Sequence, residues 1–218
     1  MSKKNIVEIY QLRFFLKGIS PLIWRRLFVT STSSLADLHY MIQISMGWSD
    51  NHLHKFDIWG KEYGLYHRGG VIFSDDATKV YLKDFQFRIN EKFRYEYDFS
   101  DYWEHEVRLE KILPFDSKKA YPMCIGGRYV CPPEDCGGPI SFMKLKDHYS
   151  IWKVEEKLLE AIERYKDNKD LEFLQENVEE LEYWLNCHKF DRQKINRHLQ
   201  LYFSNNNQLS VEEVQDED

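Results

Sequence analysis

Thiols, carboxylates and an imidazole gather in two motifs in the middle of the chain. The first motif occupies residues 95–105 (YEYDFSDYWEH) and the second occupies residues 124–138 (CIGGRYVCPPEDCGG). Thiolate and imidazole groups are the ligands that zinc prefers, and carboxylates beside large aromatic rings are costly to bury unless they are paired. We therefore expect a functional site to lie in these two motifs.

A zinc site is one interpretation of the thiols. Zinc takes four N or S ligands where it is structural, and it keeps one position open where it is hydrolytic. The candidate ligands are Cys124, Cys131, Cys136 and His105, with His52 and His54 as alternatives for the histidine. The spacing of the cysteines differs from the C-x₂-C pairs of common zinc sites, so small buried thiols are the competing interpretation.

The acids and the histidine allow two further chemistries. Asp98, Asp101 and Glu134 have the oxygen ligands that a hard divalent cation needs, although the same side chains also cap turns and accept backbone N–H groups. Cys136 and His105 would act as nucleophile and base if they came within hydrogen-bond reach. The sequence assembles no complete catalytic set, and we expect binding in preference to catalysis.

Strands and a stiff loop must position these residues. Residues 92–98 and 103–112 alternate between apolar and polar side chains, which predicts two strands joined by a turn at 98–101. In the second strand, Trp103 and His105 share the core-facing side. Pro132 and Pro133, with glycine pairs on both sides, predict a stiff loop that presents Glu134 and Asp135.

We expect the strand pair and the loop to meet in one pocket floored by Trp103 and His105. The residues expected to bind there are Asp98, Asp101, Trp103, His105, Arg25, Glu134 and Asp135. Arg25 and Arg26 are adjacent on a predicted strand, so their side chains face opposite sides of the sheet. One of the two is expected in solvent, and the other in a groove or beside a carboxylate.

The rest of the chain predicts an α+β fold. Residues 6–16 and 22–30 have the composition of strands, and residues 35–46 have helical spacing with an N-cap at Ser33 or Ser34 and a C-cap at Gly47. From residue 140 the periodicity becomes helical. We expect a mostly antiparallel, curved sheet with an early helix and C-terminal helices packed on it. The expected boundaries are a sheet domain at 1–150, a helical segment packed on it at 151–203, and an acidic disordered tail at 204–218.

Composition excludes several classes of protein. Of the 218 residues, 43% are hydrophobic, which is enough for a packed core. The net charge is −6, and five of the acids lie after residue 211, so 30 bases face 31 acids in the rest of the chain and a strongly basic footprint is absent. No apolar run approaches the roughly 20 residues that span a bilayer. Four cysteines without a secretory signal predict reduced thiols, and we expect a cytoplasmic protein with no membrane partner.

Several motifs in one order resemble the plasmid pRiA4b ORF-3-like family. They are PLIWRR at 21–26, LADLH through Gly47-Trp48 to His52, YDFSDYWEH at 97–105 and CPPEDCGG at 131–138. The resemblance covers roughly residues 6–203, with Ser100 in place of a usual glycine. It implies an α+β protein of bacterial or archaeal type, often associated with mobile elements and labelled a "TnpR" type transposon passenger. The recombinase activity that this label implies lacks support, because no arginine-surrounded serine or basic helix-turn-helix is evident.

Two functions follow from these observations. The first is a non-enzymatic binding or regulatory module whose partner is a nucleic acid or another protein, because aromatic and basic residues alternate in Phe93-Arg94-Tyr95 and Trp24-Arg25-Arg26. The alternative is a zinc protein, structural or hydrolytic, with its site at the two central motifs.

Overall fold

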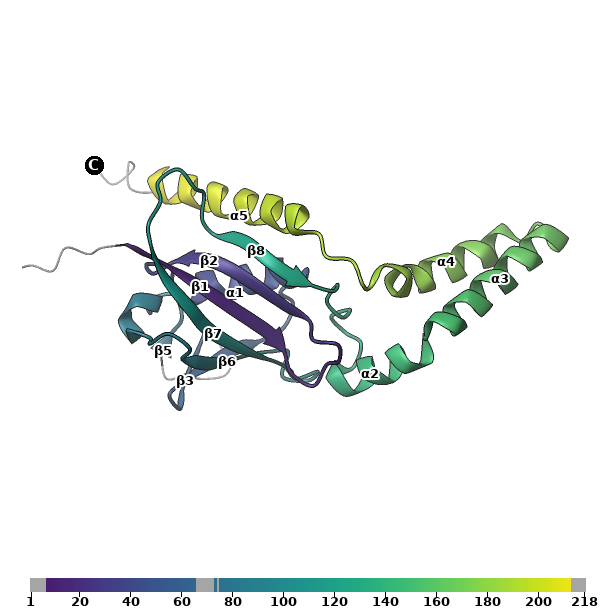
Figure 1. The fold of residues 1–218 in the computed structure, drawn as a ribbon, viewed down its shortest axis with the longest axis horizontal. Coiled ribbons are helices and arrows are strands. Elements are labelled where there is room, and N and C mark those ends of the chain that lie inside the picture. Colours follow the sequence, from purple (N-terminus) through teal and green to yellow (C-terminus); the bar gives the residue numbers. More distant parts are fainter. Residues whose placement is uncertain (1–6, 66–72, 74, 213–218) are drawn as a thin grey trace, which may run out of the picture.

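The computed structural model of the protein describes residues 7–65, 73 and 75–212 (Figure 1). Within these residues, the strands are β1 (Glu8–Leu16), β2 (Trp24–Thr30), β3 (His54–Ile58), β4 (Lys61–Gly64), β5 (Asp75–Asp76), β6 (Lys92–Tyr97), β7 (Trp103–Pro114) and β8 (Met123–Arg128). They form one curved sheet in the order β5-β4-β3-β6-β7-β1-β2-β8. All neighbouring strands are antiparallel except β4 and β5. The predicted α+β class is confirmed.

The helices are α1 (Leu35–Met46), α2 (Gly138–His148), α3 (Ile151–Asn168), α4 (Leu171–Asn186) and α5 (Arg192–Glu212), with one 3₁₀ turn, η1 (Leu82–Phe85). The early helix, α1, begins with a capping box, in which Ser34 Oγ accepts from the Asp37 N–H and Asp37 accepts from the Ser34 N–H. It ends at Gly47, whose φ of 82° is the left-handed conformation that glycine adopts without strain. Both predicted caps are confirmed.

The core lies between the sheet and α1. Along β7, buried residues alternate with half-buried ones, so that Trp103, His105 and Val107 face inward and Glu104 and Glu106 face outward. This alternation is what a strand with one covered face requires. The strand–turn–strand predicted around residues 98–101 is therefore present as β6 and β7.

The C-terminal helices have two different relations to the sheet. Helix α5 packs against β8 and α1. The Asn196 side-chain amide bonds the backbone of Cys124 twice: Oδ1 accepts from the Cys124 N–H at 2.7 Å, and Nδ2 donates to the Cys124 carbonyl oxygen at 3.0 Å. This contact covers the free edge of β8, a position that otherwise invites pairing with another chain. Helices α3 and α4 pack against each other and extend away from the sheet (Figure 1).

Two expected boundaries differ from the structure. The segment 151–203 is expected to pack on the sheet, and its α5 part does, but among the described residues the α3–α4 hairpin contacts the body near its base, where Trp184 stacks on Phe142 and Tyr149. The tail was expected to be disordered from residue 204, but α5 continues through Glu212. Extending a helix that has already formed has little free-energy cost, because each added residue gains one hydrogen bond. Residues of low helix propensity can therefore continue such a helix. Residues 213–218 lie outside the described part of the chain.

No helix among the described residues is both long enough and apolar enough to cross a lipid bilayer.

Candidate functional site

The two central motifs contact each other directly. The Gly137 N–H donates to Asp101 Oδ2 at 2.9 Å, and the Trp103 indole N–H donates to the Glu134 carbonyl at 3.1 Å. Gly138 has a φ of +75°, and a Cβ atom there would stand 2.0 Å from the Asp101 carbonyl oxygen. The strand turn and the loop are therefore adjacent, as expected, and a glycine makes the close approach possible.

Asp98 shapes the turn between β6 and β7. Its side chain is buried, its φ is 55°, and its Oδ1 accepts from the backbone N–H groups of Ser100 at 2.9 Å and Asp101 at 3.3 Å. Aspartate tolerates this left-handed conformation and closes such turns with its own carboxylate. The left-handed positions are Asp98 and Tyr102, so Ser100 replaces the usual glycine without strain.

Glu134 is the best-held carboxylate of the loop. It accepts hydrogen bonds from the Tyr97 hydroxyl and from both the N–H and the hydroxyl of Ser49. Burial opposes ionisation of Glu134, but the hydrogen bonds from Ser49 and Tyr97 outweigh it and hold its pKa below the usual range. Burial, followed by the neighbouring Glu134 carboxylate, raises the pKa of Tyr97, so the phenol remains a donor.

His52 joins the motifs from the loop before β3. Its Nε2 lies 2.8 Å from Asp135 Oδ1, and its Nδ1 lies 3.7 Å from Asp98 Oδ1. One imidazole thus contacts a carboxylate from each motif. The sequence offered His52 only as a spare zinc ligand, and its role here is to bridge the two acids.

Trp103 and His105 do not form the floor of a pocket, which corrects the expectation from the sequence. Both side chains are fully buried, and His105 packs against the rings of Phe14, Trp48 and Tyr95. Because residues on the inner face of β7 are covered by α1 and the loop after it, a ligand in solvent does not reach them. His105 is a core histidine whose Nδ1 lies 3.2 Å from the Trp103 carbonyl oxygen.

The burial of His105 predicts a pH effect on stability. Desolvation lowers its pKa to about 3, whereas an unfolded histidine titrates near pH 6.5. Between these values the unfolded chain binds the extra proton, so the stability that neutral His105 contributes is present above pH 6.5 and is lost as the pH falls toward 3. We expect this one group to cost about 3 kcal/mol at pH 4.

The measurement is urea unfolding of the wild-type protein and of His105→Phe from pH 7 to pH 4. The free energy of unfolding should fall less steeply with acidification in the variant. The carboxylates, which also lose stability in acid, are the same in both proteins and cancel from the difference. Parallel pH curves for the two proteins would contradict this account of His105.

The cysteines predicted to hold zinc are not brought together. Cys124 Sγ contacts the Gly126 carbonyl oxygen, Cys131 Sγ donates to Met46 Sδ at 3.2 Å, and His105 bonds Trp103. Among the described residues, two groups have ligand atoms within 4.8 Å of one another, and neither includes a cysteine. They are His52 with Asp98 and Asp135, and His39 with Asp50 and His54.

A Cys136–His105 catalytic pair has no support either. Burial, and then the nearby Asp101 carboxylate, raise the pKa of Cys136 to about 11. A thiol that stays protonated at neutral pH is a weak nucleophile. His105 bonds the Trp103 carbonyl instead of this thiol.

Arg25 is a buried cation for which the structure gives no carboxylate partner among the described residues. Its guanidinium donates to the carbonyl oxygens of Ser45 at 2.9 Å, Trp24 at 2.9 Å and Arg128 at 3.0 Å. Its remaining nitrogen donates to Cys131 Sγ at 2.9 Å. The neighbouring Arg26 instead forms a two-armed ion pair with Glu110. The two side chains therefore have different environments, as their adjacency on a strand predicts, but neither is free in solvent: Arg25 is buried, and Arg26 is half-buried in its ion pair.

Arg25 lines a groove of about 720 Å³, which we call the Arg25 groove. Its walls are residues 44–48 at the end of α1, residues 129–134 and part of the segment from 183 to 198. Phe190 lies on the guanidinium, with its ring centroid 4.9 Å from Arg25 Cζ. Of the expected pocket residues, Arg25 and Glu134 line this groove, whereas Asp98, Asp101 and Asp135 do not.

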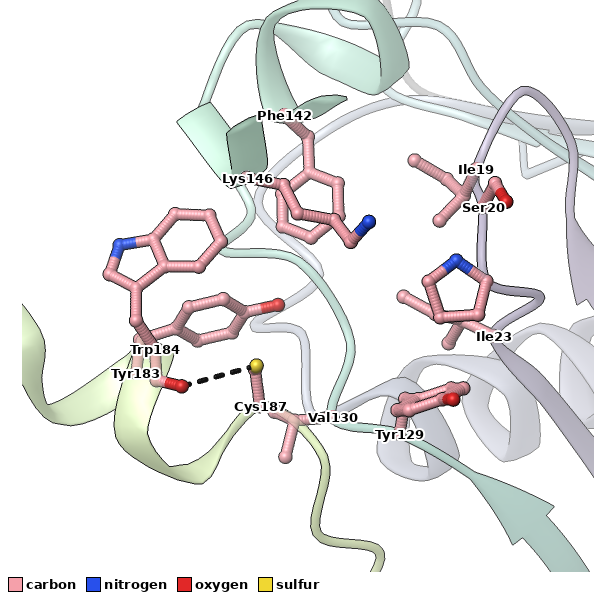
Figure 2. Close-up of a pocket in the computed structure, with 11 residues that line it drawn as sticks. Ile19, Ser20, Ile23, Tyr129, Val130, Phe142, Lys146, Tyr183, Trp184 and Cys187 are labelled. Atoms are coloured by element: carbon pink, nitrogen blue, oxygen red, sulfur yellow. Dashed lines mark hydrogen bonds between the residues drawn. The ribbon is translucent and has the colours of Figure 1, made fainter. Parts of the chain in front are cut away.

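Two further hollows adjoin this region. A groove of about 740 Å³, here the Asn196 groove, lies between the start of β8 and the first turns of α5. A smaller apolar cavity of about 70 Å³ is lined by Ile19, Ile23 and Phe142, with the Lys146 amine at its edge (Figure 2). This cavity shares Tyr129 and Tyr183 with the Arg25 groove, so the base of the α3–α4 hairpin borders both.

Fold and site together define an α+β protein in which a curved antiparallel sheet carries two interlocked motifs and a groove beside its C-terminal helix. The chain belongs to the plasmid pRiA4b ORF-3-like protein family, whose model matches residues 8–199. The resemblance read from the motifs is thus confirmed.

Two relatives share this architecture or sequence. The chain is 32% identical over 140 residues to the uncharacterized protein y4hQ of Sinorhizobium fredii (strain NBRC 101917 / NGR234), which covers 64% of this chain and 72% of that protein. It is similar to the crystal structure of the protein of unknown function MM3350 from Methanosarcina mazei Go1, with a TM-score of 0.64 and 32% identity over 87% of this chain and 98% of that one. Neither name states an activity, so the function must be argued from the site.

Proposed function

We propose that the protein is a non-enzymatic binding module that takes single-stranded nucleic acid along the first turns of α5. The observation that carries the proposal is a cluster of exposed basic side chains at the start of this helix. They are Lys189, Arg192, Lys194 and Arg197, with His198 beside them and Asp191 as the one acid among residues 189–198. Bases that neutralise phosphates supply most of the affinity of sequence-independent nucleic-acid binding.

The cluster lies between two hollows. Lys189, Lys194 and His198 line the Arg25 groove, and Arg192 and Arg197 line the Asn196 groove. A single strand of nucleic acid lying across α5 would meet a basic side chain on each side of the helix. The buried Arg25 adds positive charge beneath the first groove, where it bonds only neutral groups among the described residues.

Aromatic rings accompany the bases. Tyr129, Tyr183 and Phe190 line the Arg25 groove, and Arg128 Cζ lies 4.9 Å from the centroid of the Tyr129 ring. Nucleobases stack on such rings without regard to sequence, at about 1–3 kcal/mol per base. Aromatic and basic groups in one groove favour a single strand over a duplex, whose bases are already stacked.

The net charge of −6 does not oppose this proposal, because the acids lie elsewhere. Helix α4 carries five glutamates and no base, and five more acids lie after residue 211. A nucleic-acid ligand accords with the association with mobile elements that the family resemblance implies. The four free cysteines accord with our further proposal that the protein acts in the cytoplasm.

Charge reversal tests the proposed surface. The triple variant Arg192→Glu, Lys194→Glu, Arg197→Glu should bind a labelled single-stranded oligonucleotide at least about tenfold more weakly, because three phosphate contacts become repulsions. The dependence of log K on log salt should lose about 2 units of slope, at about 0.7 per contact. Fluorescence anisotropy measures both quantities.

The matched control is Lys144→Glu, Lys153→Glu, Lys166→Glu. These three exposed lysines lie on α2 and α3, so the variant has a similar change in net charge at another place. It should keep most of the wild-type affinity. Equal losses in both triple variants would mean that net charge and not the α5 surface governs binding, and the proposed surface would be wrong.

A further inference from the structure

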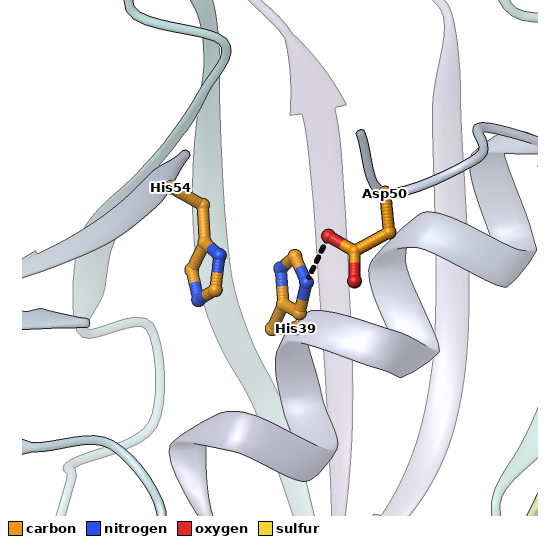
Figure 3. Close-up of side chains that lie close together, drawn as sticks. All are labelled: His39, Asp50 and His54. Atoms are coloured by element: carbon orange, nitrogen blue, oxygen red, sulfur yellow. Dashed lines mark hydrogen bonds and ion pairs between the residues drawn. The ribbon is translucent and has the colours of Figure 1, made fainter. Parts of the chain in front are cut away.

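Two buried histidines and an aspartate meet at a place that the proposed nucleic-acid surface does not use. His39 comes from the middle of α1, Asp50 from the turn after that helix, and His54 from the first position of β3 (Figure 3). His39 Nε2 lies 2.7 Å from Asp50 Oδ1, and one ligand atom from each of the three residues lies within 4.8 Å of the others. The rings of His39 and His54 stack with centroids 3.5 Å apart.

The second ring nitrogen of His39, Nδ1, also has a hydrogen-bonding partner. His39 Nδ1 lies 2.8 Å from the Tyr95 hydroxyl, which also accepts from Gln43 Nε2 at 2.8 Å. In this arrangement the Tyr95 hydroxyl donates its proton to Nδ1, and Nε2–H donates to Asp50. With the other tautomer, Nδ1–H donates to Tyr95 and the Nε2 lone pair faces Asp50. A histidine that binds a metal through Nε2 needs this second tautomer, in which the Nδ1–H donates a hydrogen bond that fixes the ring.

We propose that His39, Asp50 and His54 bind a divalent transition metal of the zinc type. Two imidazoles and one carboxylate are a donor set that zinc accepts, and three protein ligands leave a position for water. Tetrahedral ligands at about 2.0–2.1 Å from zinc stand about 3.3 Å from one another, so the His39–Asp50 contact must open by about 0.6 Å. The stacked rings, 9° from parallel, must also tilt, so that both lone pairs point at the ion.

The location permits both access and rigidity. His39 and His54 are 0% and 4% exposed, whereas the Asp50 side chain is 32% exposed, so the carboxylate lies on the side from which an ion would enter. Asp50 has a φ of 59°, a left-handed conformation that aspartate tolerates better than most residues.

The other His/Asp group is less suited to a metal. His52 turns a different nitrogen to each acid, Nε2 to Asp135 and Nδ1 to Asp98, so no single lone pair faces both carboxylates. Asp98 Oδ1 is also occupied by two backbone N–H groups. Asp135 therefore supplies a control for Asp50: each is an aspartate whose Oδ1 contacts a histidine Nε2, at 2.8 and 2.7 Å, although the Asp135 side chain is 76% exposed and the Asp50 side chain 32%.

The test is a zinc titration of the full-length protein after treatment with a chelator. Calorimetry should give one zinc ion per chain, and zinc should raise Tm, because an ion that binds only the folded state stabilises it. Asp50→Asn, which keeps the shape and tolerates the left-handed backbone, should weaken zinc binding by more than the roughly 10–100-fold that loss of an outer-shell partner costs. Asp135→Asn should bind zinc as the wild type does.

The metal-free variants provide the structural control, since both should have Tm values close to that of the metal-free wild type. Cobalt adds a second readout, because its visible absorption in the wild type should change in Asp50→Asn and remain in Asp135→Asn. The proposal is overturned if the wild type takes up no zinc, if Asp50→Asn binds it with unchanged affinity, or if the loss occurs in Asp135→Asn instead. None of these outcomes depends on nucleic-acid binding, so this site and the α5 surface stand or fall separately.

Discussion

Gly138→Ala is expected to lower the free energy of unfolding by more than about 3 kcal/mol. The residue has a φ of +75°, which costs an alanine about 1–2 kcal/mol by itself. The added Cβ would also stand 2.0 Å from the Asp101 carbonyl oxygen, a backbone atom that cannot rotate away. The loop and the turn would have to separate, which would break the Gly137–Asp101 hydrogen bond as well.

Gly47→Ala is the matched control for this prediction. Gly47 has a similar φ of +82°, but a Cβ there would meet nothing within 4 Å. Its replacement should cost only the conformational part, about 1–2 kcal/mol. Urea unfolding of the two variants separates the contact from the backbone strain. Equal destabilisation would show that the two central motifs are not packed as closely as described.

The second large effect is expected for Arg25→Met, at about 4 kcal/mol of stability. Methionine fills the space but leaves the carbonyl oxygens of Ser45, Trp24 and Arg128 without their donor. A buried acceptor that loses its partner costs about 1–3 kcal/mol, so the loss exceeds that of a surface ion pair. It should also weaken oligonucleotide binding, because the charge beneath the Arg25 groove is gone.

The adjacent Arg26→Met is its control. Arg26 is partly exposed and pairs with Glu110, a contact expected to contribute no more than about 1 kcal/mol. Because Arg26 lines neither groove, oligonucleotide binding should be unchanged. Thermal unfolding and anisotropy of both variants test the two roles together. Similar losses for Arg25 and Arg26 would contradict the assignment of Arg25 as the buried support of the groove.

Local patterns in the sequence predicted much of the fold. Alternation placed Trp103 and His105 on the inner face of β7, and cap chemistry placed the ends of α1 at Ser33 or Ser34 and at Gly47. These features depend on neighbours in the chain, and so a single sequence contains them. The two motifs were also expected to meet if the sheet brought them together, and they do contact each other, although no pocket forms over Trp103 and His105.

The site was harder to predict because its members come from distant parts of the chain. A histidine on the inner face of a strand has the same sequence pattern whether it lines a pocket or packs in the core. The contacts with Trp48 and Tyr95 show that His105 packs in the core. The sequence contains the basic residues of the segment 189–198, but it does not show that they lie between two grooves. The packing of α5 on β8 places a groove on each side of them. The meeting of His39 with His54 likewise depends on how α1 lies on the sheet.

The most direct test of the α5 surface is the affinity of the wild-type protein for a labelled single-stranded oligonucleotide across a series of salt concentrations. The account predicts binding at low salt and a linear fall of log K with log salt. Three or more phosphate contacts should give a slope of about −2 or steeper. Absence of binding at low salt, or an affinity that does not change with salt, would contradict it.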